Sequence, residues 1–127
     1  MKLIVDTSIL IDHLRGGNAW KKIAGEIDDD TQLFVPTIVL FELFSGTSTK
    51  DPVNVRQIYK LLSNFQRLDL SEAVARQAGE LYRDTKKTLQ VPDYIIAASA
   101  LQMNATVVTL NKKHFAQITH LSLYPLP

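Results

Sequence analysis

The feature that most constrains this chain is the alternation of short apolar, largely β-branched runs with stretches of helical periodicity. Five runs have the character of strands, residues 3–5, 33–35, 68–70, 105–110 and 121–123. Between them, apolar residues recur every three or four positions, as on one face of a helix. Neighbouring parallel strands need crossover connections, which are usually helical. The sequence therefore predicts an α/β domain built on a parallel sheet.

The helical stretches have recognisable boundaries. Asn18 and Ser71 each stand where a helix is expected to begin, and each can cap it. The longest helix follows Ser71, and its buried side is expected to consist of Ala75, Ala78, Leu81 and Tyr82. Residues 95–103 are apolar on nearly every side, which predicts a helix that lies deep in the core.

Length and charge set broad limits. The chain has 127 residues, of which 46% are hydrophobic, so we expect one compact domain over residues 1–127. A formal net charge of +1 does not by itself indicate a nucleic-acid-binding protein. If three acids gather in one pocket, however, only ten of the 13 acids remain elsewhere against 14 basic residues. Such an outer surface could hold a polyanion.

Two absences bear on where the protein works. The chain contains no cysteine, which excludes disulfides and zinc–thiolate sites. The first apolar run stops at Asp6, too early for the apolar region of a signal peptide, and no later run is long enough to span a bilayer. These features predict a cytoplasmic protein without a membrane segment.

Three acids stand in positions that are hard to explain as ordinary surface residues. Asp6 ends the first predicted strand, and functional residues of parallel sheets gather at the carboxyl ends of strands. Glu42 lies mid-helix among apolar neighbours, where a carboxylate is costly to bury unless it is paired or bound to a cation. Asp93 introduces the helix that has scarcely any polar face. Asn111 follows the fourth predicted strand and would face the same sheet edge as Asp6.

Each of these residues also has a simpler explanation. Asp6 and Asp93 could cap the helices that follow them, since acids at helix starts are common. Glu42 satisfies no cap and has no basic partner nearby in the sequence. Thr7 and Ser8 could cap the first helix or could hydrogen-bond the carboxylates, and the sequence leaves both interpretations open. A single shared site would explain all three acids together.

Four segments resemble the motifs of the PIN-domain nucleases. They follow the family's order along nearly the whole chain, as Leu-Ile-Val-Asp-Thr-Ser (3–8), Phe-Glu-Leu-Phe-Ser-Gly (41–46), Pro-Asp-Tyr-Ile-Ile-Ala-Ala (92–98) and Thr-Leu-Asn-Lys-Lys-His-Phe (109–115). The short length and the Glu-Leu-Phe-Ser-Gly form are similar to the VapC-type toxins of prokaryotic toxin–antitoxin pairs. Each motif alone is unspecific, but four in sequence identify the family.

The resemblance implies a three-layer α/β/α domain around a parallel sheet of about five strands. It also implies a Mg²⁺- or Mn²⁺-dependent endoribonuclease, with Asp6, Glu42 and Asp93 as the core acids. At the fourth position many relatives have an acid, whereas this chain has Asn111, with His114 three residues later. The partners that the resemblance implies are RNA, a cognate antitoxin protein and a second copy of the chain, often within a larger complex that binds DNA.

The donor set suits this chemistry. Phosphodiester hydrolysis needs a nucleophile at neutral pH and stabilisation of charge on the phosphoryl oxygens, and a hard divalent cation supplies both. Mg²⁺ prefers oxygen ligands, whereas a Cys or His cluster would suggest zinc. We expect Asp6 and Asp93 to be the principal metal ligands and Glu42 to help to position the metal and the attacking water. Three neighbouring hydroxyls could hold these carboxylates, those of Thr7, Ser8 and Thr109.

Other conspicuous residues have plain structural explanations. Asp12 and His13 are expected on the exposed side of the first helix, and the acids at 28–30 at a solvated helix end. Lys86-Lys87 and Lys112-Lys113 are expected to be solvated, although the second pair could contact phosphates. Four aromatic residues are expected in the core or at an interface, Trp20, Phe34, Phe41 and Phe44.

Two other functions stay open on the sequence alone. The chain could be a weakly active or inactive PIN-fold RNA-binding or regulatory module, an alternative that Asn111 favours. It could also be a phosphoacceptor signalling domain, which places an Asp at the end of its first parallel strand. That alternative fits less well, because such domains want an acceptor Asp at the end of the third strand, and here Asp69 is expected inside that strand.

Overall fold

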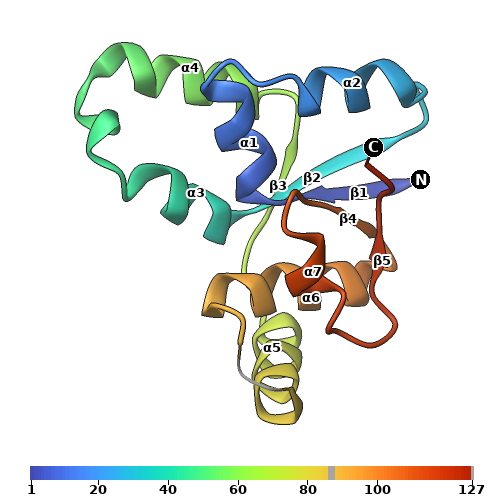
Figure 1. The fold of residues 1–127 in the computed structure, drawn as a ribbon. Helices are drawn as coiled ribbons and strands as arrows, with labels where there is room; N and C mark the ends of the chain where they lie inside the picture. The colour runs from blue at the N-terminus through green and yellow to red at the C-terminus, as the bar shows by residue number, and fades with distance from the viewer. Residues whose placement is uncertain (86–87, 127) are drawn as a thin grey trace.

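Five short parallel strands form the centre of the molecule (Figure 1). In chain order they are β1 (Lys2–Val5), β2 (Gln32–Pro36), β3 (Gln66–Leu68), β4 (Thr106–Val108) and β5 (Ser122–Leu123). Their order across the sheet is β3-β2-β1-β4-β5, and every pairing is parallel. The structure, a computed structural model, describes residues 1–85 and 88–126, so the prediction for Lys86-Lys87 lies outside the described residues. The predicted α/β fold with a five-stranded parallel sheet is confirmed.

Helices connect the strands and cover both faces of the sheet. They are α1 (Thr7–Leu14), α2 (Ala19–Glu26), α3 (Thr37–Phe44), α4 (Pro52–Leu62), α5 (Glu72–Asp84), α6 (Val91–Met103) and α7 (Lys112–Phe115), with a 3-10 turn, η1 (Thr47–Lys50), before α4. On one side of the sheet lie α1, α2 and α4, and on the other lie α5 and α6 (Figure 1). This is the expected three-layer arrangement. In the described part of the chain, no helix has the length and apolar character needed to cross a membrane.

The register of the sheet fixes where the functional residues emerge. Val5 pairs with Val108 at the carboxyl ends of β1 and β4, and the Asp6 amide donates to the Val108 carbonyl at 2.9 Å. Both valines are completely buried. Because the strands run parallel, the residues that follow β1 and β4 meet at one edge of the sheet. Asp6 and Thr109 therefore begin their loops side by side.

Helix α6 is the most deeply buried helix, as its apolar sequence predicts. Tyr94, Ile96, Ala97, Ala98, Ser99 and Ala100 are all buried. The small side chains at 97–100 let the helix backbone lie close to the sheet, and α6 contacts β1, β2 and β4. This packing fixes the first turn of the helix, and with it Asp93, near the ends of the central strands.

Three local predictions were wrong. The third strand is Gln66–Leu68, not 68–70, because its register is set by backbone pairing with Phe34–Pro36. Asp69 therefore follows the strand and is exposed. On α5, Val74 and Ala78 are buried whereas Ala75 and Tyr82 are exposed, since the helix turns a narrower face toward α6 than its sequence suggests. The N-cap side chain of Asn18 makes no capping hydrogen bond, while that of Ser71 accepts from the Val74 amide as predicted.

The topology also argues against a phosphoacceptor domain. Because Asp69 follows directly after β3, the objection that this acid lies inside the strand no longer holds. However, such signalling domains have the strand order 2-1-3-4-5, whereas this sheet has the order 3-2-1-4-5. The two folds therefore bring different loops to the functional edge.

Candidate active site

Asp6 is a buried carboxylate held by two hydroxyl groups. Its side chain is only 3% exposed, and its Oδ2 accepts from Thr109 Oγ1 at 2.7 Å and from Ser8 Oγ at 2.8 Å. Asp6 occupies the N-cap position of α1, but its side chain makes no capping hydrogen bond. The simple capping explanation therefore does not account for it.

The hydroxyls that hold Asp6 are themselves fixed by the β4–α7 loop. The Leu110 amide donates to Ser8 Oγ at 3.0 Å, and the Asn111 amide donates to Thr109 Oγ1 at 2.9 Å. Each hydroxyl therefore accepts a backbone proton and directs its own proton at the Asp6 carboxylate. This network ties the end of β1 to the end of β4 and restricts the rotamer of Asp6.

A hydrogen bond joins Glu42 of α3 to α1. Thr7 Oγ1 donates to Glu42 Oε1 at 2.6 Å, and Thr7 is buried while Glu42 is half-buried. Burial raises the pKa of the Glu42 carboxyl, the Thr7 hydrogen bond opposes that rise, and the charges of Asp6 and Asp93 add to it. Of the two interpretations left open for Thr7 and Ser8, carboxylate hydrogen bonding is the one that these contacts support.

Asp93 has both a capping role and an electrostatic one. Its Oδ2 accepts from the Gln90 amide at 3.1 Å, which closes a capping box at the start of α6. Burial raises the pKa of its carboxyl, the Gln90 amide lowers it, the Asp6 charge raises it and the His114 charge lowers it. Asp93 therefore lies near enough to Asp6 and His114 to interact with both.

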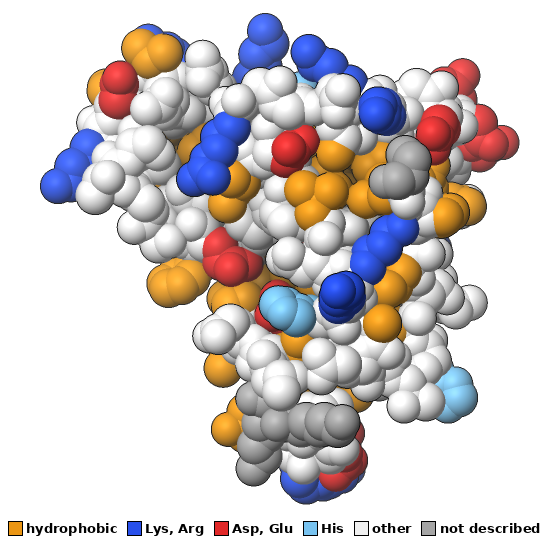
Figure 2. Space-filling view, viewed as in Figure 1, with side chains coloured by type: hydrophobic (Ala, Val, Ile, Leu, Met, Phe, Trp, Pro, Cys, Tyr) orange, Lys and Arg blue, Asp and Glu red, His pale blue; other side chains and the backbone are white. Residues whose placement is uncertain are grey.

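The three predicted acids thus share one electrostatic neighbourhood, although they come from three separate motifs. Figure 2 shows acidic side chains and a histidine close together in the hollow between the α3 and α6 ends of this face. Within residues 1–85 and 88–126, no three His, Asp or Glu side chains form an arrangement that could hold a metal ion as they stand. The metal ligand set therefore stays a prediction.

The chemistry of the donors fits a hard divalent cation. All three donors are carboxylates, and burial and neighbouring charge raise the pKa of Glu42 and Asp93; a bound cation would offset the cost of burying these charges and their mutual repulsion. Mg²⁺ commonly binds through one or two carboxylates and keeps several of its waters, so a tight three-carboxylate cage is not required.

Residues 111–114 follow β4 and line a hollow together with Thr109, whose hydroxyl holds Asp6. Asn111 is exposed and occupies the N-cap position of α7 without a side-chain capping bond. The charge of His114, one turn later, lowers the pKa of the Asp93 carboxyl. Sequence reasoning noted His114 but assigned it no role, and its only signal was the helical spacing from Asn111.

Asp12 and His13 are not on the exposed side of α1, contrary to prediction. Both are half-buried, because α1 packs against α2 on that side. Asp12 Oδ2 accepts from the Ala19 amide at 3.2 Å, so Asp12 supplies the α2 cap that Asn18 was expected to supply. The acids at 28–30 are exposed as predicted, and Asp28 Oδ1 accepts from the Asp30 amide at 3.0 Å.

The two lysines at the start of α7 differ in exposure, and so do the four aromatic residues. Lys113 is exposed, but Lys112 is half-buried and its Nζ donates to the Leu126 carbonyl at 3.0 Å. Trp20 and Phe34 are in the core, as expected, and Phe44 packs at its edge. Phe41 is 67% exposed and is therefore not a core residue.

Comparisons with known proteins agree with this geometry. The family model described as PIN domain matches residues 3–121. Two relatives from Mycobacterium tuberculosis are ribonuclease VapC10, 31% identical over 94% of this chain and 90% of the relative, and ribonuclease VapC19, 32% identical over 95% and 97%. The structure of VapBC2 from Rickettsia felis bound to a DNA fragment from their promoter superposes with a TM-score of 0.87 at 26% identity, covering 98% of each chain.

Proposed function

Because this chain belongs to the PIN-domain family, with VapC ribonucleases among its relatives, we propose that it is a Mg²⁺- or Mn²⁺-dependent endoribonuclease and the toxin of a toxin–antitoxin pair. The observation that carries this proposal is the buried Asp6 carboxylate with Glu42 and Asp93 in electrostatic reach. A cluster of like charges around one buried and two half-buried carboxylates is costly for folding, and a functional site is the usual reason to keep one.

Each residue has a distinct task in the proposed reaction. Asp6 and Asp93 would hold the divalent ion, with Glu42 beside them. When bound, the ion would lower the pKa of water and polarise the phosphate. The Ser8 and Thr109 hydroxyls keep Asp6 in one orientation, and the Thr7 hydroxyl keeps the Glu42 carboxylate turned toward α1. The Asn111 side chain would orient substrate or water without adding negative charge.

The test is the double variant Asp6→Asn with Asp93→Asn. Metal-dependent cleavage of RNA should fall at least about 100-fold, which corresponds to about 3 kcal/mol of transition-state stabilisation. The matched control is Asp69→Asn, which removes an exposed acid at the end of another strand and should leave cleavage unchanged. Full metal-dependent activity in the double variant, in a preparation free of contaminating ribonuclease, would reject the roles assigned to Asp6 and Asp93.

The proposed partners follow from the same relatives. Solved neighbours include VapBC2 from Rickettsia felis with promoter DNA and VapBC-1 from Haemophilus influenzae. We accordingly propose a cognate antitoxin that covers the active site, a homodimer of this chain, and a larger complex that binds DNA through the antitoxin. Expression with and without the neighbouring gene product, followed by mapping of cleaved RNA ends, tests the pairing and identifies the RNA target.

One observation favours a second candidate function, RNA binding without efficient turnover. At the position where the resemblance to the PIN motifs implies an acid, the chain has Asn111, which adds no negative charge to hold a metal ion. Binding of RNA without metal-dependent cleavage would support that alternative. The ribonuclease names of its relatives favour the enzyme.

A further inference from the structure

The segment that leads into Asp93 is held at several points. Asp93 Oδ2 accepts from the Gln90 amide at 3.1 Å, which fixes the carboxylate to the start of α6. Thr88 Oγ1 donates to Gln117 Oε1 at 2.6 Å and so ties the segment to the loop after α7, while Leu89 is buried. Because the carboxylate is fixed to the first turn of α6, the position of that turn decides where the carboxylate lies.

Tyr94, the next residue, anchors this turn to α5. Its side chain is only 2% exposed, and its hydroxyl shares a hydrogen bond of 2.9 Å with Thr85 Oγ1. Thr85 is the C-cap residue of α5. The bond therefore joins the end of α5 to the start of α6, two helices that pack against each other (Figure 1).

The ring of Tyr94 has a separate contact. It packs edge-on against the ring of Tyr82 in α5, with the centroids 5.5 Å apart and an angle of 83° between the planes. A phenylalanine at position 94 would keep this ring contact and lose only the hydroxyl. The substitution Tyr94→Phe therefore isolates the hydrogen bond from the burial of the side chain.

The geometry of a helix links this anchor to the carboxylate. Consecutive side chains lie about 100° apart around the helix axis, so a rotation of the turn that moves Tyr94 moves Asp93 by the same angle. A catalytic group that is displaced by about 1 Å can cost about 100-fold in rate. A bond that stops the turn from rotating or tilting therefore matters for the chemistry as well as for folding.

We propose that Tyr94 is a positioning residue for Asp93. Through its hydrogen bond with Thr85 it fixes the first turn of α6 and keeps the Asp93 carboxylate at the acidic cluster, without touching substrate or metal ion itself. The proposal rests on the proposed ribonuclease function, and it gives one of the proposed metal ligands a support on α5.

Tyr94→Phe and Thr85→Val test the bond in the full chain. The dissociation constant for Mn²⁺, measured without RNA by electron paramagnetic resonance, should rise about fivefold in each variant, the factor that one net hydrogen bond supplies. The kcat for RNA cleavage should fall by a similar factor with little change in KM. The double variant should lose no more than either single variant, because both remove the same bond. Thr85→Ser keeps the hydroxyl and should keep wild-type values.

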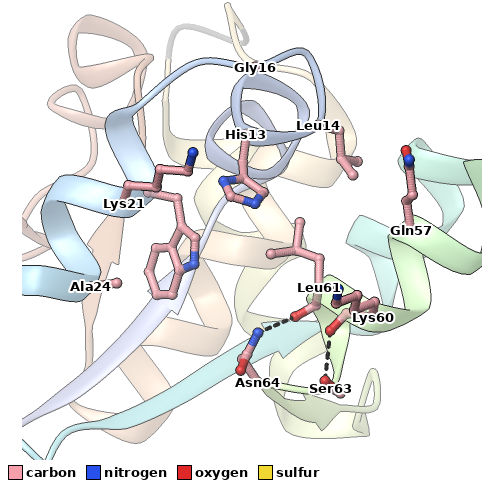
Figure 3. A pocket seen from close by; sticks show the side chains of 11 residues that line it. His13, Leu14, Gly16, Lys21, Ala24, Gln57, Lys60, Leu61, Ser63 and Asn64 are labelled. Atoms are coloured by element: carbon pink, nitrogen blue, oxygen red, sulfur yellow. Dashed lines mark hydrogen bonds between the residues drawn. The ribbon is translucent and has the colours of Figure 1, made fainter.

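Two controls separate positioning from general stability. Ser99 is buried in α6, and its Oγ donates to the Ile95 carbonyl at 2.8 Å, so Ser99→Ala removes a hydroxyl later in the same helix. Ser63 Oγ donates to the Lys60 carbonyl at 2.6 Å at the end of α4, on the other face of the sheet (Figure 3). Ser99→Ala and Ser63→Ala should lower the melting temperature at most and leave Mn²⁺ affinity unchanged. If Ser99→Ala weakens Mn²⁺ binding as much as Tyr94→Phe does, the proposal is wrong.

The background variant Asp93→Asn shows whether Tyr94 acts through Asp93. In that background Tyr94→Phe should cause no further loss of Mn²⁺ affinity, and an equal loss in both backgrounds would contradict the proposal. If Asp93→Asn weakens Mn²⁺ binding but Tyr94→Phe does not, the positioning role alone fails. If Asp93→Asn itself binds Mn²⁺ like wild type, the metal-binding role in the proposed function fails, and the positioning role fails with it.

Discussion

The Thr7 hydroxyl of α1 affects how readily the Glu42 carboxyl of α3 ionises. Its hydroxyl donates to Glu42 Oε1, and the two residues are 35 positions apart in the chain. The bond lowers the pKa of the Glu42 carboxyl, against a rise that burial and the neighbouring acids cause. Removal of the hydroxyl should therefore make Glu42 harder to ionise, without changing the shape of the side chain at position 7.

We expect Thr7→Val to shift the acidic limb of the pH–rate profile to higher pH. Cleavage should fall several-fold near pH 6 and less near pH 8, because a smaller fraction of Glu42 is charged at the lower pH. The free energy of unfolding should drop by about 1 kcal/mol, the usual cost of one lost hydrogen bond. Thr47→Val, at an exposed position in η1, is the control and should do neither. A profile that falls equally at all pH values would contradict the assigned effect.

For single residues, the sequence predicted which charged side chains are unusual but not which groups they contact. Glu42 could be selected because a mid-helix acid among apolar neighbours has no local explanation. The Thr7–Glu42 hydrogen bond and the unpaired Nδ1 of His13 could not be predicted from the sequence. Both depend on how helices that are distant in the chain pack together. Asp12 was misjudged for the same reason, because its partner amide belongs to the next helix.

Among the elements, α2 begins in an unusual way, with its cap supplied by the preceding helix. Asp12 of α1 accepts from the Ala19 amide, and Gly17 lies directly beneath the Asp12 carboxylate. A Cβ at position 17 would collide with that carboxylate and push it away. Gly25, later in α2, has open space where a Cβ would lie.

Gly17→Ala and Gly25→Ala should therefore change stability in opposite directions. Gly17→Ala should lower the free energy of unfolding by about 1 kcal/mol, because the displaced Asp12 side chain loses the cap. Gly25→Ala should raise it by about 0.5–1 kcal/mol, because alanine costs less backbone entropy in a helix. Urea denaturation of both variants measures these values. Equal effects of the same sign would show that the Asp12 cap contributes nothing.

The elements differ in how well the sequence predicted them. Strand β1 and helix α6 were predicted correctly because dense apolar runs are buried wherever the fold places them. Strand β3 was misplaced by two residues because it is an edge strand with exposed Gln66 and Arg67, so its sequence lacks a burial pattern. Only its pairing with β2 determines where it lies.

At the scale of the whole molecule, the fold brings together three acids whose charges repel one another. Asp6, Glu42 and Asp93 arrive from the ends of separate elements, and their proximity raises the pKa of both Glu42 and Asp93 beyond the rise caused by burial. The motif order predicted that these residues converge, but the hydroxyls that support them required the packed structure.

Burial, together with this repulsion, predicts how stability depends on pH without metal. A carboxyl whose pKa is higher in the folded than in the unfolded state binds more protons when folded, so its contribution to stability is largest in acid and is lost as the pH rises through the raised range. In EDTA, Glu42→Gln with Asp93→Asn should therefore gain stability relative to wild type as the pH rises from acid to neutral. Mg²⁺ at ten times its Kd should stabilise wild type by about 1.4 kcal/mol at neutral pH, but not the variant. Thermal melting across pH measures both effects, with Asp69→Asn as the control, and parallel curves for wild type and variant would show that the acids do not repel one another.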